Sequence, residues 1–150
     1  MKKLIPLFSV LLVIIAVSSL ACGGTNSNGT SSTTVGTRVD AEGGFYTSIN
    51  SAELNQMLQN KDFILVNTNP VVSVTIPDTD LHIPVNELVA DLSQVSQDKT
   101  EKIVVYCMIG ASSSIAAVEF VKMGYTNIYN LSGGIVEWQQ QGYSVIAPQQ

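Results

Sequence analysis

Two short runs of consecutive apolar residues constrain the fold of this chain more than any other feature. They are FILV at residues 63–66 and IVVY at residues 103–106, and neither shows the alternation of a half-exposed strand. Runs of this length, rich in β-branched residues, are typical of parallel strands that are buried on both faces. The sequence therefore predicts a single α/β domain, with a parallel β-sheet flanked by helices on both faces.

Helix signals separate these runs. Asn50 is expected to cap a helix, because its side chain can accept backbone N–H bonds and Glu53 follows three residues later. Asn86 is expected to cap a second, short helix. The other predicted elements are a strand at 126–131 and helices at 112–123 and 135–141, the helices being followed by Gly124 and Gly142.

The N-terminus has the three-part layout of a secretory leader. Lys2 and Lys3 precede an apolar run at 4–17, and small residues come just before Cys22. The stretch SSLAC at 18–22 resembles a bacterial lipobox, with Ser19 where Leu is commoner. That resemblance implies a lipoprotein signal peptide at 1–21 and attachment of diacylglycerol to Cys22. An ordinary signal peptide or an uncleaved membrane anchor is the alternative.

The next segment is rich in Gly, Ser, Thr and Asn and lacks hydrophobic periodicity. Such a composition buries too little apolar surface to fold, so residues 22–44 are interpreted as a flexible tether. Residues 45–148 are then the folded domain. Its expected location is extracytoplasmic, in the periplasm or at the cell surface, held to a bacterial membrane by the N-terminal lipid.

Charge and cysteine content exclude several function classes. Seven basic and twelve acidic residues give a net charge of −5. An acidic chain lacks the clustered Lys and Arg that neutralise nucleic-acid phosphates or anionic lipid head groups. Two cysteines, Cys22 and Cys107, are too few for a disulfide framework or a four-cysteine zinc site. We expect no metal, no other cofactor and no nucleic-acid partner.

Cys107 is the candidate nucleophile. It follows the strand at 103–106, and the loop after it leads into the helix at 112–123. Ligand sites in α/β sheets lie at the carboxyl ends of strands, and the first turn of a helix offers backbone N–H groups that favour a thiolate. A buried cysteine that merely packs at a strand end is the alternative. Spacing alone leaves both interpretations open.

Residues 45–145 resemble a rhodanese-like domain, a sulfurtransferase fold in which a cysteine carries a persulfide. Matching segments occur in the family's order along the chain, at 63–69, 82–84, 103–113, 115–125, 131–138 and 142–143. The resemblance implies that Cys107 is the catalytic residue. It also implies a substrate-binding loop made of Met108, Ile109, Gly110, Ala111, Ser112 and Ser113.

The charged residues of the family pattern are missing. The family loop usually reads Cys-Arg-x-Gly-x-Arg-Ser, and here Met108 and Ser112 occupy the two Arg positions. The family's Asp-Val-Arg is Asn-Thr-Asn at 67–69, and residues 45–148 contain no Arg. A charge-assisted hydrogen bond contributes about 1.5–3 kcal/mol, so thiosulfate is expected to bind poorly. Backbone N–H groups remain available to hold a persulfide.

The sequence favours two functions and excludes a third. The first is an extracytoplasmic sulfurtransferase that moves a sulfane sulfur from thiosulfate or a related donor, through a Cys107 persulfide, to a thiol or cyanide. The second is a non-catalytic module that binds a partner or small anion. A cysteine phosphatase is excluded, because Ser113 stands six residues after Cys107 where that chemistry needs Arg. His82, the only histidine, is either a partner for Cys107 or a loop hydrogen-bonding residue.

Overall fold

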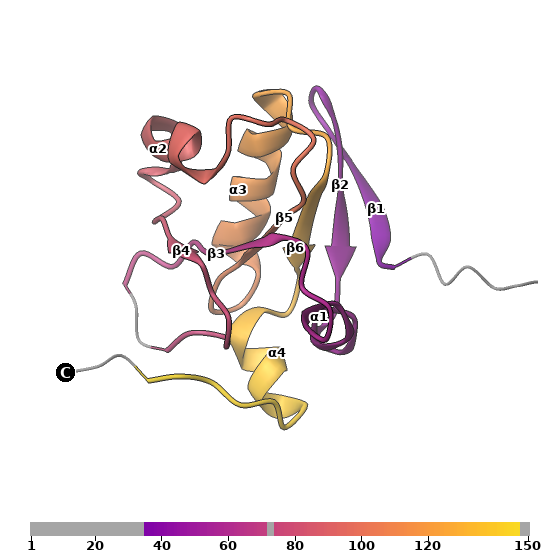
Figure 1. Cartoon of the computed structure of the whole chain (residues 1–150), viewed down its shortest axis with the longest axis vertical. Coiled ribbons are helices and arrows are strands. Elements are labelled where there is room, and N and C mark those ends of the chain that lie inside the picture. The colour runs from indigo at the N-terminus through magenta and orange to yellow at the C-terminus, as the bar shows by residue number, and fades with distance from the viewer. Residues whose placement is uncertain (1–34, 72–73, 148–150) are drawn as a thin grey trace, which may run out of the picture. The chain divides into compact units, whose positions relative to one another are not determined.

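The computed structural model describes residues 35–71 and 74–147, with only the backbone at 89 and 91–93. The strands are β1 (Thr37–Ala41), β2 (Gly44–Ile49), β3 (Ile64–Asn67), β4 (Leu81–His82), β5 (Ile103–Tyr106) and β6 (Ile128–Leu131). The helices are α1 (Ser51–Leu58), α2 (Leu88–Val95), α3 (Ala111–Lys122) and α4 (Gly134–Gln140) (Figure 1).

These strands form one sheet in the order β1-β2-β6-β5-β3-β4. Every neighbouring pair is parallel except β1 and β2, which are antiparallel. The predicted α/β fold is therefore confirmed, with an antiparallel strand added at one edge. The three predicted strands and the helices predicted at 112–123 and 135–141 lie within two residues of the observed bounds.

Strand β5 explains why the apolar runs are continuous. Ile103 and Val105 belong to a core cluster that α3 covers, while Val104 and Tyr106 belong to a second cluster that α1 and α4 cover. Alternate side chains of a strand point to opposite faces, and both faces of β5 are buried. Helices therefore cover both sides of the sheet, as the sequence predicted.

The two predicted helix caps have different outcomes. Asn50 caps α1, because its Oδ1 accepts the Glu53 N–H at 2.9 Å and Glu53 Oε2 accepts the Asn50 N–H at 2.8 Å. The prediction for Asn86 was wrong. Glu87 is the N-cap of α2 and makes no side-chain cap bond. The Pro84 carbonyl instead accepts the N–H groups of Glu87 and Leu88, so a backbone turn begins this helix.

The tether prediction was wrong for its last residues. β1 lies inside the predicted 22–44 segment and pairs with β2 from Thr37↔Ser48 to Ala41↔Gly44. Its Val39 packs on the core cluster that contains Tyr46 and Val121. The folded part therefore begins before residue 45. Residues 1–21, Cys22 and the rest of the tether before residue 35 lie outside the described residues.

Strand β1 also brings an arginine into the folded part, contrary to the division at residue 45. Arg38 donates to Asp40 at 2.8 Å and its guanidinium lies 3.6 Å from the centre of the Phe45 ring.

Within the part of the chain that the structure describes, no helix is long and apolar enough to cross a bilayer.

We predict that a fragment starting at residue 45 is less stable than one starting at residue 35. The shorter fragment loses β1, exposes the hydrogen-bonding edge of β2 and removes the apolar contact of Val39. Fully burying a valine side chain contributes about 1.5–3 kcal/mol, and Val39 is partly buried, so the free energy of unfolding should fall by about 1 kcal/mol or more. Urea unfolding followed by circular dichroism measures the difference, and equal midpoints would contradict the role given to β1.

Candidate active site

The Cys107 thiol lies in a polar cradle rather than among aliphatic side chains. Cys107 directly follows β5 and is only 2% exposed. The Gly110 N–H donates to its Sγ at 3.1 Å, and the Ser113 hydroxyl lies 3.4 Å from the same sulfur. Buried thiols in apolar surroundings lack such donors. The contacts are those expected of a site that stabilises a thiolate.

The pKa of Cys107 is lowered from its ordinary value. Burial is the largest single effect and raises the pKa, because it removes water from the charged form. Hydrogen bonds from the Ser112 and Ser113 side chains, with backbone hydrogen bonds of Ser113 and Ile109, together outweigh it. The N-terminus of α3 adds partial positive charge on the same side. The thiolate form of Cys107 is thereby favoured.

Serines at 112–114 can either cap the following helix or donate hydrogen bonds into the site, and the start of α3 decides between these roles. Its N-cap is Gly110, with no side-chain cap bond, so Ser112, Ser113 and Ser114 are in the first turn. Ser113 is fully buried and shares its hydroxyl between Cys107 Sγ and the Gly110 carbonyl. Ser114 instead donates to the Ala111 carbonyl at 2.7 Å. Serines of this loop therefore contact the thiol or the backbone and cap nothing.

Helix α4 is hydrogen-bonded to the backbone of the cysteine loop. The Ile135 N–H donates to the Cys107 carbonyl at 2.9 Å, and the Val136 N–H donates to the Met108 carbonyl at 3.0 Å. These are among the first N–H groups of α4, which have no acceptor within their own helix. Because the two loop carbonyls are engaged toward α4, the loop N–H groups that follow are left to face the thiol.

Two glycines permit this close approach. Gly110 has φ 85°, and a Cβ built on it would lie 1.8 Å from the Ser132 carbonyl oxygen. Gly134 has φ 59°, and its Cβ would lie 2.4 Å from the Cys107 carbonyl oxygen. Any side chain at either position would push the cysteine loop away from the segment 132–134.

Asn69 is a positioning residue that sequence reasoning missed. Its Oδ1 accepts the Met108 N–H at 2.8 Å, and its own N–H donates to Asn67 Oδ1 at 3.0 Å. The Asn69 carbonyl lies 2.7 Å from Nε2 of His82. A signal existed, since polar residues at 67–69 end a strand that was predicted to be parallel to β5. His82 is thus a hydrogen-bonding residue at the end of β4 rather than in a loop, and its described bond is to the Asn69 carbonyl rather than to Cys107.

The remaining predicted loop residues differ in their surroundings: the Ser112 side chain bonds the thiol, and Met108 packs against the second core cluster. Met108 and Ser112 are half-buried, whereas Ile109 and Ala111 are exposed. No cluster of three or more His, Cys, Asp or Glu side chains that could hold a metal occurs in the described ranges 35–71 and 74–147.

Comparison with known proteins identifies the family. A model of the rhodanese-like domain matches residues 50–141. The chain belongs to the rhodanese-like domain family. A sulfurtransferase of Allochromatium vinosum is 31% identical to this rhodanese-like chain over 105 residues, which cover 67% of the chain and 95% of that protein. The tRNA uridine(34) hydroxylase of Erwinia tasmaniensis is 29% identical over 99 residues, but these make up only 28% of its length.

Solved structures show the same rhodanese-like fold. A rhodanese-related protein of Thermoplasma volcanium superposes with a TM-score of 0.56 at 28% identity, covering 67% of this chain and 98% of that one. A rhodanese-like domain from Anabaena has a TM-score of 0.59 at 20% identity, with 67% and 79% covered. The resemblance found in the sequence is therefore confirmed. The role of Cys107 as the nucleophile stays a prediction, which the geometry above supports.

We predict that Ser113→Ala raises the pH at which Cys107 becomes reactive. Removing the hydroxyl removes one hydrogen bond to Sγ, so the pKa of Cys107 rises and the thiolate is lost as the pH falls through a higher value. The rate of iodoacetamide alkylation at Cys107, followed by peptide mass spectrometry against pH, gives the midpoint. Ser114→Ala is the matched control, because its hydroxyl bonds the Ala111 carbonyl. Superimposable profiles for wild type and Ser113→Ala would contradict this prediction.

We also predict that Gly134→Ala destabilises the fold more than Gly142→Ala. Both glycines have positive φ, but nothing lies within 4 Å of a Cβ at Gly142, whereas at Gly134 the Cβ meets the cysteine loop. Gly142→Ala should cost about 1–2 kcal/mol from backbone conformation alone. Gly134→Ala adds the displacement of the loop, so it should cost more and slow Cys107 alkylation. Urea unfolding measures the free energy of unfolding of each variant. Equal losses in the two variants would contradict the importance of the close contact between Gly134 and the cysteine loop.

Proposed function

We propose that this protein is an extracytoplasmic sulfurtransferase of the rhodanese type that carries a sulfane sulfur as a persulfide on Cys107. The donor is thiosulfate or a related compound, and the acceptor is a thiol or cyanide. The observation that carries the proposal is the donation of the Gly110 N–H to Cys107 Sγ, beside the Ser113 hydroxyl. The leader-like residues 1–21 and the lipobox-like Cys22 support the proposed lipid anchor.

The chemistry follows from a stabilised thiolate. In the first step Cys107 Sγ attacks the outer sulfur of the donor, and a new S–S bond forms. The bond between that sulfur and the rest of the donor breaks, and its electron pair leaves with sulfite when thiosulfate is the donor. In the second step the acceptor attacks the terminal sulfur and the Cys107 thiolate leaves. The same N–H and hydroxyl donors that stabilise the nucleophile stabilise this leaving group.

A specific observation favours a second candidate, the non-catalytic binding module. Cys107 is 2% exposed, and the loop 108–113 has no Arg or Lys to attract an anionic donor. A module of this kind would use the loop to hold a partner or small anion without forming a persulfide. The lowered pKa of Cys107 favours the transferase, because a binding module has no use for a thiolate.

The direct test is the mass of the protein after exposure to sulfur donors. We predict that the full chain, incubated with thiosulfate or with glutathione persulfide, gains one sulfur atom that reductant removes. Cys107→Ser should show no such gain on the tryptic peptide that spans residue 107. A known sulfurtransferase loaded under the same conditions is the positive control. Failure of both donors to load Cys107 while the control loads would favour the binding module.

A further inference from the structure

Three large apolar side chains around the cysteine loop are exposed. Ile109 in the loop is 63% exposed, Ile115 in α3 is 57% exposed and Val136 in α4 is 38% exposed. We call these three residues the apolar rim. Each comes from a different segment that contacts or follows Cys107. Exposed apolar side chains that gather in one region mark a binding site more often than single scattered ones, because such a region is unfavourable in water.

The backbone contacts place these segments together. The Val136 N–H donates to the Met108 carbonyl at 3.0 Å, so the first turn of α4 lies against the loop. Ile115 is one helical turn beyond Ala111, which is exposed on the same face of α3. The Gly110 N–H points inward to the thiol, whereas the side chain of Ile109 is turned out to solvent. The three rim residues therefore lie on the cysteine loop itself, on the helix that follows it and on the helix bonded to it.

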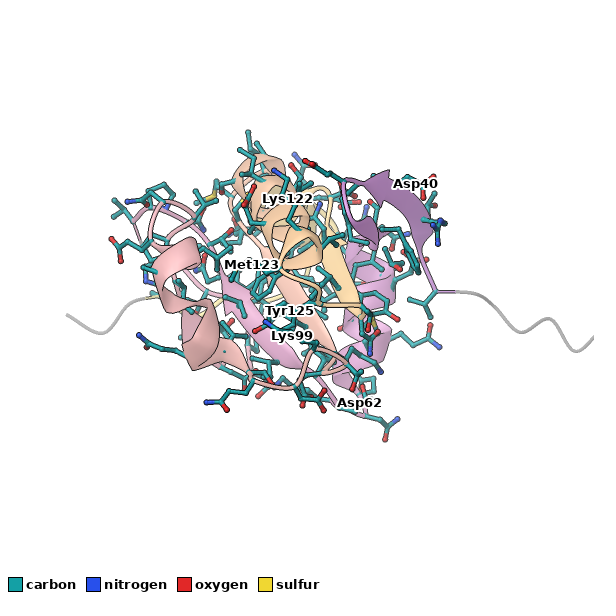
Figure 2. All side chains as sticks on the ribbon, turned by 90° about the horizontal axis from the view of Figure 1, so that it is seen from above. Asp40, Asp62, Lys99, Lys122, Met123 and Tyr125 are labelled. Carbon is teal, nitrogen blue, oxygen red and sulfur yellow. The ribbon has the colours of Figure 1, made fainter. Side chains whose placement is uncertain are left out.

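No cation accompanies the rim in the described part of the chain. The five described basic residues all pair elsewhere: Arg38 with Asp40, Lys61 with Asp80, Lys102 with Asp62, Lys122 with Glu119, and Lys99 over the Tyr125 ring. Figure 2 shows Lys99 beside Tyr125, with Lys122 on α3. The donors that surround the thiol are therefore uncharged N–H and O–H groups.

The topology keeps these cations away from Cys107. Lys61 and Lys102 lie before the amino ends of β3 and β5, whereas Cys107 follows the carboxyl end of β5. Lys122 ends α3, roughly 16 Å along the helix from the turn beside the thiol. Arg38 is on β1, three strands from β5 in the sheet order. A doubly charged donor such as thiosulfate would meet uncharged donors at the thiol and exposed apolar side chains around the cysteine loop.

We propose that the apolar rim binds the hydrocarbon group of an organic sulfur donor, and that such donors are preferred to thiosulfate. This inference rests on the proposed sulfurtransferase function and names its donor class. The donor is a singly charged thiosulfonate or an organic persulfide, R–SO₂–S⁻ or R–S–SH, with an apolar R group. Transfer from the first is balanced: Cys107–S⁻ and R–SO₂–S⁻ give Cys107–S–S⁻ and R–SO₂⁻. The S–S bond forms at Cys107 as the donor S–S bond breaks, and the sulfinate leaves with the electron pair.

The test uses thiosulfonates that share one reactive group and one charge. Methane-, propane- and butanethiosulfonate are compared with thiosulfate on the full chain, and the initial rate of persulfide formation on Cys107 is followed by mass spectrometry. We expect each added methylene to raise the rate about two- to fourfold, the effect of moving a CH₂ group out of water. Thiosulfate should be slowest. A rate that is independent of chain length, or fastest with thiosulfate, would overturn the inference.

Two pairs of variants sharpen the test. Ile115→Ser should reduce the rate gain per methylene, whereas Met123→Ser, which removes an exposed apolar side chain at the far end of α3, should leave every rate unchanged. Ala111→Arg should raise thiosulfate loading about tenfold relative to Ala111→Gln, since it restores a charged donor beside the loop. Unchanged chain-length dependence in Ile115→Ser would refute the rim.

These outcomes separate the two proposals. If no donor loads Cys107, the proposed sulfurtransferase function fails. If donors load Cys107 but neither the length of R nor Ile115→Ser affects the rate, the function stands and the apolar rim is refuted.

Discussion

The site depends on the hydrogen bonds between the first turn of α4 and the carbonyls of Cys107 and Met108. A loop of four residues between β5 and α3 has many possible conformations, and only a few turn its N–H groups toward one sulfur. Donation by Ile135 and Val136 fixes the carbonyls on the far side, and Gly134 permits the approach. The arrangement of donors around Cys107 therefore depends on the position of α4, which follows directly after β6.

A cradle made of backbone groups explains how the site tolerates neutral substitutions. In the family pattern, charged side chains surround the loop, whereas here Asn69 fixes the Met108 N–H through a neutral amide oxygen. Ser112 and Ser113 supply hydroxyl groups where the family has Arg and Ser, and they lower the pKa of Cys107 against the opposing effect of burial. Chemical reactivity can persist while attraction for anions is lost. Under the proposed function, selectivity then depends on the apolar side chains of the rim rather than on charge.

Much of this was predictable, and the errors have physical causes. Continuous apolar runs predicted β3 and β5 because both faces of these strands are buried. Strand β1 was missed because the residues before it are rich in Gly, Ser and Thr, and its own alternation of Arg38, Val39, Asp40 and Ala41 is short. The cap at Asn86 failed because the Pro84 carbonyl already satisfies the N–H groups that start α2. Asn69 was overlooked as a contact of Met108, since only strand register brings residues 39 positions apart together.

The sequence by itself determined the alternation of strands and helices, the place of Cys107 at a strand end, and the absence of arginine from the loop that follows it. Local composition and periodicity are sufficient for these, because each depends on neighbours along the chain. Only the tertiary structure decided that α4 is hydrogen-bonded to the cysteine loop and that Ser113 faces the thiol. It also decided that every described cation pairs with a group away from Cys107. Those properties depend on the packing of segments that are distant in sequence, which no local pattern contains.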